Sequence, residues 1–388
     1  MTMMTKTFAS TLLILLISFQ TAISTSTEAE PRLCHSPELY DDFPMLCQML
    51  DRLHEDKDAL ADEITAWAAE RKLLVGEGWD MKKAKQLETT LSSSGSSKLP
   101  VVFAHGMGDS CFNSGFQNLV KHTSSLLNDV YSVCIPTGKD KSEDTTNGYL
   151  LNMDASVDVF AESVKADPKL NDGFHAIGLS QGNNVIRGYI TRYNEPAVNT
   201  FISINGVNAG TGALPNCFPD VNDENGGKKL GSVCSLLTEQ ASKRAYSDFY
   251  QQHNFQANYW RDPNHQDDYR NFSQLARWNN EGEPFNQTYK DNFAKTTKFV
   301  WVRATKDGMV WPSEGEHWCA PDPAAPLKHI LPRNETEWYT TDSFGLKTAE
   351  EAGKNHYISF EGDHLQFSME DYTDWVNKYL GDSETGTM

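Results

Sequence analysis

The stretch Gly178–Gly182, with the sequence Gly-Leu-Ser-Gln-Gly, constrains the fold of this chain most strongly. The apolar run 174–177 precedes it, and residues 183–189 have the composition of a helix start. Where a strand turns sharply into a helix, a serine projects its hydroxyl above the sheet, and flanking glycines avoid clashes with neighbouring elements. The backbone N–H groups at the start of the helix favour negative charge. The pattern predicts that Ser180 is a catalytic nucleophile; the alternative is a glycine-rich turn with an ordinary serine.

The composition is that of a soluble globular protein. Of the 388 residues, 39% are hydrophobic and 22% are charged, which differs from disordered and membrane proteins. The length suits one large α/β domain with an extension. The net charge of −19 argues against binding to a phosphate backbone, so no nucleic-acid partner is expected.

Residues 1–24 have the order of a secretory signal peptide. Lys6 precedes the apolar run 12–17, and small residues follow up to Ser24, where we expect cleavage. The run is short for a membrane span, and an uncleaved signal anchor is the alternative. No second apolar segment of spanning length follows. We therefore expect no stable membrane span after cleavage and a location in the secretory pathway.

The seven cysteines are expected to pair in an oxidising compartment. Their spacing makes three neighbouring pairs and leaves Cys319 over. The pairs are Cys34 with Cys47, Cys111 with Cys134, and Cys217 with Cys234. No Cys-x-x-Cys or Cys/His cluster has zinc spacing, so no metal site is expected. Asn-x-Ser/Thr sequons at Asn271, Asn286 and Asn334 are candidate glycan sites on surface loops.

Residues 25–98 are expected to form a helical N-terminal extension that ends in a serine-rich linker, 92–97. Apolar residues recur at three- and four-residue steps between Leu53 and Ala68, and Met81–Leu91 has the pattern of a further short helix. We interpret this segment as an accessory helical hairpin or a spacer. A propeptide, or a cap over the active site, is the alternative.

Residues 99–382 alternate strands with helices, as is typical of a parallel, doubly wound sheet. A long helix is expected at 148–166. The expected strands are 99–104, 130–135, 174–177, 201–206, 298–304 and 356–360.

An insertion, about 207–297, interrupts this alternation. Segments of this length after the strand that follows such a turn commonly act as lids or substrate-binding subdomains, and aromatic side chains there can line an acyl groove. Ordinary helical packing is the alternative. The aromatic residues are Tyr246, Phe249, Tyr250, Phe255, Tyr259 and Trp260.

Two further residues complete a catalytic set with Ser180. Asp307 directly follows the strand 298–304, and His364 follows the last strand. The order Ser, Asp, His is that of hydrolases with a strand–Gly-x-Ser-x-Gly–helix turn. His364 would act as the base for the serine, and Asp307 would orient the imidazole.

Competing residues are weaker candidates. Asp342 has no apolar run before it, and Asp363 is adjacent to His364, which rarely allows a bond to Nδ1. We interpret His105, His175 and His253 as structural or surface residues, as is usual for a lone histidine.

A glycine-rich loop supplies the remaining part of the predicted site. The first strand of the sheet ends in His-Gly-Met-Gly-Asp-Ser, 105–110. Such a loop provides one backbone donor to the oxyanion, and the residue after the nucleophile provides the other. Met107 and Gln181 are therefore the predicted oxyanion donors.

The segment from about Leu99 to Leu380 resembles the lysosomal palmitoyl-protein thioesterases. The most specific matching strings are His105–Cys111 (His-Gly-Met-Gly-Asp-Ser-Cys) and Glu361–Gln366 (Glu-Gly-Asp-His-Leu-Gln). Further matches are Asp167–Leu170, Gly178–Gly182, Ala245–Ser247, Tyr259–Trp260 with Asp262–Pro263, and Tyr269–Asn271.

The resemblance implies an α/β-hydrolase fold with a mostly parallel central sheet and a helical acyl-binding insertion. It implies the triad Ser180, Asp307 and His364, the oxyanion donors Met107 and Gln181, and no cofactor. It also implies glycans at sequons like Asn271 and Asn286, and a disulfide between Cys217 and Cys234.

The implied reaction is the hydrolysis of long-chain fatty acyl thioesters from S-acylated cysteines of proteins or peptides, in the lysosome or outside the cell. An oxyester lipase or esterase, an acyl-CoA hydrolase, and a non-catalytic acyl-binding protein are the alternatives. Three departures stand out. Asn183 replaces a glycine beside the nucleophile, a family disulfide near Phe160 and Tyr193 has no cysteines, and residues 25–98 have no counterpart.

Overall fold

The computed structural model describes residues 34, 37–91, 99–215, 217–219 and 232–381. The predicted signal peptide, 1–24, and the linker, 92–97, lie outside these described residues. The described residues form two compact units, which divide between Leu60 and Ala61. Among the described residues, no helix combines the length and the apolar character that crossing a membrane requires.

The first unit contains two short helices, α2 (Pro37–Asp42) and α3 (Pro44–Glu55), and the start of α4 (Lys57–Glu70). A disulfide joins Cys34 to Cys47, with 5.6 Å between their Cα atoms. Leu46, Cys47 and Leu50 are buried on one side of α3, so the disulfide and these side chains form the core of this unit.

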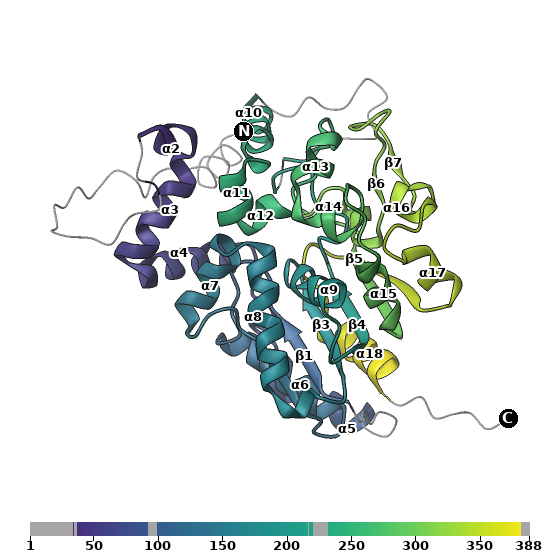
Figure 1. Ribbon diagram of the computed structural model, residues 1–388. Coiled ribbons are helices and arrows are strands. Elements are labelled where there is room, and N and C mark those ends of the chain that lie inside the picture. The colour runs from purple at the N-terminus through teal and green to yellow at the C-terminus, as the bar shows by residue number, and fades with distance from the viewer. Residues whose placement is uncertain (1–33, 35–36, 92–98, 216, 220–231, 382–388) are drawn as a thin grey trace, which may run out of the picture. The chain divides into compact units, whose positions relative to one another are not determined.

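A six-stranded sheet forms the centre of the second unit, with the order β2-β1-β3-β4-β5-β8 (Figure 1). All neighbouring strands in it are parallel. The strands are β1 (Val101–Ala104), β2 (Ser132–Cys134), β3 (Phe174–Leu179), β4 (Val198–Ile204), β5 (Lys298–Ala304) and β8 (Asn355–Phe360). A separate antiparallel pair consists of β6 (Ala320–Pro321) and β7 (Ile330–Leu331).

Helices cover both faces of the sheet. Successive side chains of a strand point to opposite faces, and in β1 Val101 and Phe103 belong to one hydrophobic cluster while Val102 belongs to another. The first cluster includes residues of α6 (Ser114–Leu126) and α18 (Met369–Leu380). The second includes residues of α8 (Met153–Ala166) and α9 (Gly182–Arg192). Figure 1 shows α8 and α9 in front of the strands and α18 behind them.

This arrangement confirms the predicted fold class, a mostly parallel central sheet flanked by helices. The remaining helices, with three short 3-10 helices labelled η, are α5 (Met81–Leu91), α7 (Lys141–Leu150), η1 (Pro168–Leu170), α10 (Ser232–Ala245), α11 (Asp248–His253), α12 (Phe255–Asn258), α13 (Gln266–Phe272), α14 (Gln274–Trp278), α15 (Gln287–Lys295), η2 (Ser313–His317), η3 (Arg333–Glu335), α16 (Glu337–Thr340) and α17 (Leu346–Glu351).

The prediction of one helix over 148–166 is wrong. The chain leaves α7 at Leu150 and starts α8 at Met153. Asn152 lies between them, and its side-chain oxygen accepts the N–H of Ala155 at 2.9 Å. An asparagine in this position satisfies a free donor of the first helical turn, which favours a new helix start over a continuous helix.

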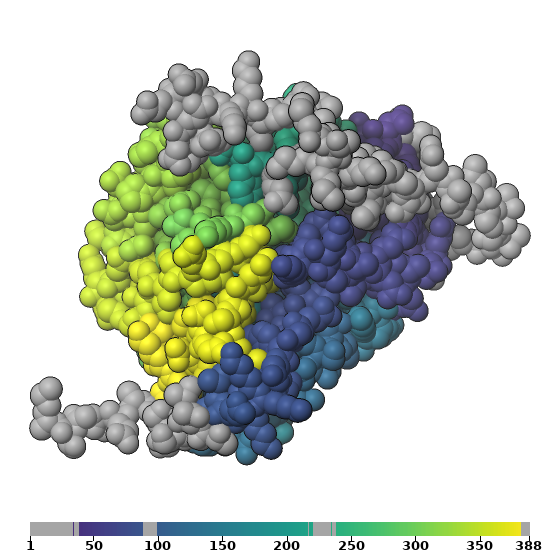
Figure 2. Space-filling view, turned by 180° about the vertical axis from the view of Figure 1, so that it is seen from behind, coloured from purple at the N-terminus to yellow at the C-terminus, as the bar shows by residue number. Residues whose placement is uncertain are grey.

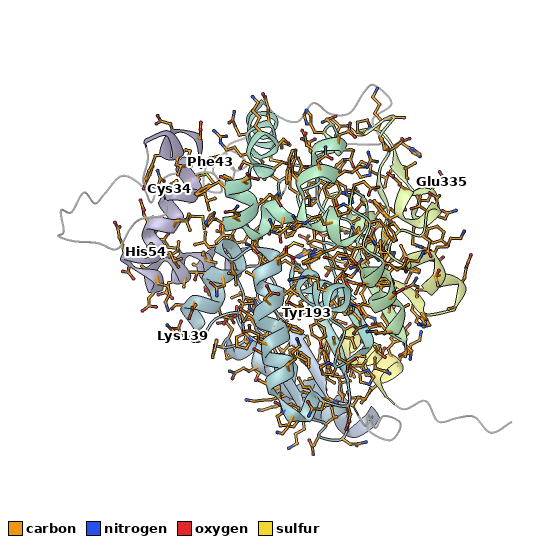
Figure 3. The ribbon with its side chains drawn as sticks, in the orientation of Figure 1. Cys34, Phe43, His54, Lys139, Tyr193 and Glu335 are labelled. Atoms are coloured by element: carbon orange, nitrogen blue, oxygen red, sulfur yellow. A yellow bond between two sulfur atoms is a disulfide. The ribbon has the colours of Figure 1, made fainter. Side chains whose placement is uncertain are left out.

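Polar contacts join α8 to the end of α9, where the resembling family has a disulfide. The hydroxyl of Tyr193, labelled in Figure 3, donates to Asp158 at 2.5 Å. Arg192 forms an ion pair with the same carboxylate at 2.9 Å. On the buried side, the rings of Phe160 and Tyr189 are in contact, with 5.4 Å between their centroids. These contacts connect the two helices without cysteines.

Residues 61–91, which the sequence analysis grouped with the N-terminal extension, belong to the second unit. Trp79 packs its ring against His122 and Tyr372, at 6.1 and 5.7 Å between ring centroids. Lys83 of α5 forms an ion pair with Glu370 of α18. Figure 2 shows α5, in blue, beside the yellow C-terminal helix.

Two disulfides lie in the second unit, Cys111–Cys134 and Cys217–Cys234, and Cys319 is free. The first connects the loop after β1 to β2. The predicted glycan sites Asn271 and Asn334 are exposed, but they lie in α13 and η3 and not on loops as expected. Asn286 is half-buried, and its side-chain oxygen accepts the N–H of Thr288.

Candidate active site

Ser180 lies between β3 and α9 in the left-handed backbone region, with φ of 53°. Its own N–H donates to the carbonyl of Ile204 in β4 at 3.0 Å. The flanking glycines are required by close approach of other backbone. A Cβ on Gly182 would lie 2.3 Å from the carbonyl oxygen of Ala104, and one on Gly178 would lie 2.8 Å from Cα of Asn183. The strained turn thus holds the serine above the carboxyl ends of the strands.

A continuous hydrogen-bonded chain leads from the serine to a carboxylate. Nε2 of His364 lies 2.7 Å from Oγ of Ser180, and Nδ1 lies 2.5 Å from Oδ2 of Asp307. All three side chains are buried. The other carboxylate oxygen of Asp307 accepts the N–H groups of Met309 and Val310, each at 2.7 Å. The structure therefore brings the three predicted triad residues together, although 184 positions separate Ser180 from His364.

The competing aspartates have other partners. Asp342 forms an ion pair with Lys290 at 2.8 Å. Oδ1 of Asp363 accepts the N–H groups of Gly308 and His364, at 2.8 and 2.7 Å. Asp363 therefore holds the loop that carries His364 against the loop after β5, and it does not orient the imidazole.

Glu316 is a carboxyl group beside the triad that the sequence analysis did not identify. It is fully buried, and its Oε2 accepts hydrogen bonds from Asn205 and from the N–H of Ala304, at 2.8 and 3.1 Å. One carboxylate oxygen each of Asp307 and Glu316 and one ring nitrogen of His364 lie within 4.8 Å of one another. No local pattern predicts this placement, because η2 carries Glu316 back across the end of the sheet.

The two neighbouring carboxyl groups have opposite pKa shifts. Burial and the charge of Asp307 raise the pKa of Glu316 well above its ordinary value. Burial alone would also raise the pKa of Asp307. The charge of the adjacent His364 and the hydrogen bonds to the carboxylate outweigh burial and hold this pKa below its ordinary value. The lowered pKa favours the ionised form of Asp307, and the raised pKa favours the neutral form of Glu316.

Of the two predicted oxyanion residues, Met107 lies in the loop after β1, and Gln181 directly follows Ser180. Gln181 is buried and marks the start of α9. Its side chain donates to the carbonyl of Gly148 at 2.7 Å and accepts from Gln256 of the insertion at 2.9 Å. Met107 lies in the glycine-rich loop, where a Cβ on Gly106 would come within 3.1 Å of Cβ of Ser180. The loop therefore lies directly against the nucleophile.

Asn183, which departs from the resembling family, bridges the serine turn to β4. It is fully buried, and its Nδ2 donates to the carbonyls of Ser180 and Ile204, both at 2.9 Å. A glycine at this position would leave both carbonyls without this donor. The asparagine thus adds two hydrogen bonds that hold the turn in place.

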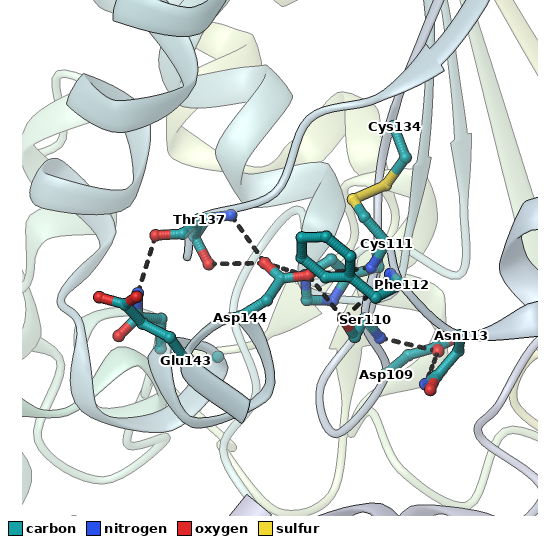
Figure 4. A network of polar contacts seen from close by, with 12 residues as sticks. Asp109, Ser110, Cys111, Phe112, Asn113, Cys134, Thr137, Glu143 and Asp144 are labelled. Atoms are coloured by element: carbon teal, nitrogen blue, oxygen red, sulfur yellow. Dashed lines mark hydrogen bonds and ion pairs between the residues drawn. A yellow bond between two sulfur atoms is a disulfide. The ribbon is translucent and has the colours of Figure 1, made fainter. Parts of the chain in front are cut away.

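A buried ion pair organises the loop that carries Met107. Nε2 of His105 lies 3.0 Å from Asp144, and Nδ1 lies 2.9 Å from the carbonyl of Gly106. Both ring nitrogens face acceptors, so both must carry a proton. Asp144 also accepts from the hydroxyl of Ser110 and from the N–H of Cys111, at 2.8 and 2.9 Å. Figure 4 shows Asp144 at the centre of this network, beside the Cys111–Cys134 disulfide.

The pairing of His105 makes stability depend on pH. Burial would lower the pKa of His105, but the Asp144 carboxylate outweighs burial and raises it to about 9. A raised pKa in the folded state contributes stability below the unfolded value of about 6.5, and this contribution is lost as the pH rises through about 9. We expect the wild-type free energy of unfolding to fall by about 3 kcal/mol over this window relative to His105→Gln. Urea unfolding of both proteins across the window measures this difference, and parallel profiles would contradict the assignment.

A small apolar cavity adjoins Gln181. Its volume is about 20 Å³, and Ile135, Val185 and Phe255 contribute to its lining, which leaves space for about one water molecule. Phe255, Tyr259 and Trp260 of the insertion are buried in the hydrophobic core. These three aromatic side chains of the insertion thus serve as core packing.

A serine on a strand-to-helix turn, with an acid and a histidine after later strands of one parallel sheet, defines an α/β hydrolase. A family model described as palmitoyl protein thioesterase matches residues 100–364. The chain belongs to this family and is thus a hydrolase of that fold.

Curated relatives agree with this membership. Palmitoyl-protein thioesterase 1 of Caenorhabditis elegans is 33% identical over 271 residues, which cover 69% of this chain and 87% of the relative. Palmitoyl-protein thioesterase 3 of Dictyostelium discoideum is 30% identical over 274 residues, covering 70% and 87%. Among solved structures, the carboxylesterase CesB from Bacillus subtilis is 10% identical, with a TM-score of 0.35 and coverage of 77% of this chain and 96% of that one.

Proposed function

We propose that the protein hydrolyses long-chain fatty acyl thioesters, palmitoyl thioesters above all, from S-acylated cysteines of proteins or peptides. The observation that carries this proposal is the buried hydrogen-bonded chain Ser180–His364–Asp307 in a member of the palmitoyl protein thioesterase family. The names of the nematode and Dictyostelium relatives support the palmitoyl-protein substrate.

In the first step, His364 takes the hydroxyl proton of Ser180 at Nε2, and Oγ forms a bond to the thioester carbonyl carbon. Asp307 accepts a hydrogen bond from Nδ1–H of His364 and stabilises the imidazolium that results. When the carbonyl re-forms, the carbon–sulfur bond breaks, the cysteine sulfur receives the proton from His364, and the acyl group stays on Ser180.

In the second step, water replaces the thiol. His364 takes a proton from the water, whose oxygen attacks the acyl-serine carbonyl. The carbon–oxygen bond to Ser180 then breaks, and His364 returns the proton to Oγ. The products are the free fatty acid and the unmodified enzyme.

The backbone N–H groups of Met107 and Gln181 would stabilise the oxyanion in both steps. Each such donor contributes about 3 kcal/mol to transition-state stabilisation. The side-chain bonds from Gln181 to Gly148 and Gln256 support this role, because they fix the residue before the substrate binds.

The acyl chain would bind beneath the insertion, next to Gln181 and Phe255. The apolar lining of the 20 Å³ cavity supports this place, and its small size implies that insertion side chains move apart to admit a chain. Burial of each methylene group would contribute about 0.8 kcal/mol to binding.

We place the protein in the secretory pathway, in the lysosome or outside the cell. The N-terminal signal pattern, the disulfides Cys34–Cys47, Cys111–Cys134 and Cys217–Cys234, and the exposed sequons at Asn271 and Asn334 support this location.

A comparison of matched substrates tests the proposed function. The purified protein is given a palmitoyl-cysteine peptide, the corresponding O-palmitoyl serine peptide, and palmitoyl-CoA, at acidic pH. The proposal predicts the highest kcat/KM for the thioester peptide. Faster turnover of the serine ester would indicate a lipase or esterase, faster turnover of the CoA thioester an acyl-CoA hydrolase, and binding without turnover a non-catalytic protein.

A further inference from the structure

A second, larger cavity lies beside the catalytic histidine. Its volume is about 230 Å³. One wall comes from the chain before the α/β domain, and the other comes from the loops that carry Asp307 and His364. Glu70, Arg71, Lys72 and Leu73 line the first wall, and Asp363 and His364 belong to the second. The first four lie outside the segment 100–364 that matches the family model.

The turn Arg71–Leu73 is held in place by the end of α4. The N–H of Leu73 donates to the carbonyl of Ala68 at 2.9 Å, and Lys72 has a φ of 57°. This six-to-one bond around a left-handed residue is the usual way in which a helix end is closed. The chain therefore turns sharply after Glu70 and presents the turn to the cavity.

The same segment also packs against the glycine-rich loop. The N–H of Val75 donates to Asp109 at 3.2 Å in a buried bond. A Cβ on Gly108 would lie only 2.6 Å from Cβ of Ala68, and one on Gly76 would lie 2.3 Å from the carbonyl oxygen of Gly115. Residues 68–76 thus fit the loop that carries Met107 closely. They form part of the catalytic unit, which argues against a propeptide that is removed.

The position of the cavity indicates which part of a substrate enters it. In acyl transfer, the leaving group departs beside the imidazole that gives it a proton. In the proposed reaction, the carbonyl oxygen would face the N–H groups of Met107 and Gln181, and the acyl chain would enter the apolar cavity next to Gln181. The space that His364 itself lines is therefore on the leaving-group side.

The lining is suited to polar groups. The guanidinium of Arg71 donates hydrogen bonds to the carbonyl of Trp67 and to Glu70, at 3.2 and 3.4 Å. The carboxylate of Asp363 accepts hydrogen bonds from two backbone N–H groups. Lys72 is exposed, and within the described ranges no acidic side chain pairs with its ammonium group. The cavity thus offers an unpaired positive charge beside the point where the thiol leaves.

We propose that this cavity is a leaving-group subsite that binds the polypeptide next to the acylated cysteine, and that Lys72 favours an acidic side chain there. This inference rests on the proposed thioesterase function. It predicts that the enzyme distinguishes S-acylated peptides by the residue beside the cysteine, through the segment that precedes the α/β domain.

The test uses two S-palmitoyl peptides that differ only in an aspartate or a lysine beside the cysteine, and the palmitoyl thioester of a small neutral thiol. The wild-type protein is expected to have a kcat/KM about fivefold higher for the aspartate peptide. Lys72→Glu should reverse this preference, measured as the ratio of each peptide's kcat/KM to that of the small thioester. Lys121→Glu is the matched control, since Lys121 is an exposed lysine of α6 that lines neither cavity, and it should keep the wild-type preference.

The other outcomes overturn the subsite alone or overturn both proposals. An unchanged ratio between the peptides in Lys72→Glu, or an equal fall for all three substrates, would overturn the subsite. If the wild-type protein hydrolyses none of the thioesters, the proposed function fails, and the subsite fails with it.

Discussion

Replacing Ser180 by alanine is expected to lower kcat for a palmitoyl-cysteine peptide by about 10⁴- to 10⁶-fold, because no acyl-enzyme can form. Alanine fits the site, since Oγ of Ser180 is the only heavy atom lost. The hydrogen bond from the backbone N–H of residue 180 to the carbonyl of Ile204 remains. The fold should therefore be kept, and the loss should appear in kcat with little change in the unfolding midpoint. Steady-state hydrolysis at saturating peptide measures the effect.

Ser132→Ala is a suitable control for this substitution. Ser132 lies in β2, and among the described residues its hydroxyl donates only to the nearby carbonyl of Val130, so its loss should leave kcat unchanged. A fluorophosphonate probe should label the wild-type protein and Ser132→Ala but not Ser180→Ala. Wild-type activity in Ser180→Ala would mean that another residue is the nucleophile.

The change Asp307→Asn is expected to lower kcat by about 10⁴-fold. The N–H groups of Met309 and Val310 both point at Oδ1, so the amide oxygen of the new side chain would remain there. Its NH₂ group would then face Nδ1 of His364 and force the ring proton onto Nε2. In that tautomer the imidazole cannot accept the proton of Ser180.

Asp342→Asn is the matched control, because this carboxylate pairs with Lys290 and should be dispensable for turnover. The pKa of Asp307, held below its ordinary value chiefly by His364 against the effect of burial, keeps the wild-type carboxylate ionised at acidic pH. Hydrolysis rates of the three proteins at acidic and neutral pH check both points. Equal losses in Asp307→Asn and Asp342→Asn would contradict the assigned acid.

Local patterns in the sequence were sufficient for the fold class and for proposing a catalytic set. The glycines around Ser180 indicate a backbone constraint that acts within five residues. The apolar runs before Asp307 and His364 indicate buried strands. In a parallel sheet the carboxyl ends of all strands meet at one edge. The chain order alone therefore predicted that these side chains would be neighbours.

Contacts between distant segments have no such local signature, and only the tertiary structure decided them. Asn183 departs from the family in sequence, but the fold brings it under the carbonyl of Ile204. Glu316 lies on an irregular segment that crosses the end of the sheet. The turn Arg71–Leu73 comes to the side of His364. Periodicity indicates which face of an element is buried, whereas the identity of what covers it depends on how all elements pack together.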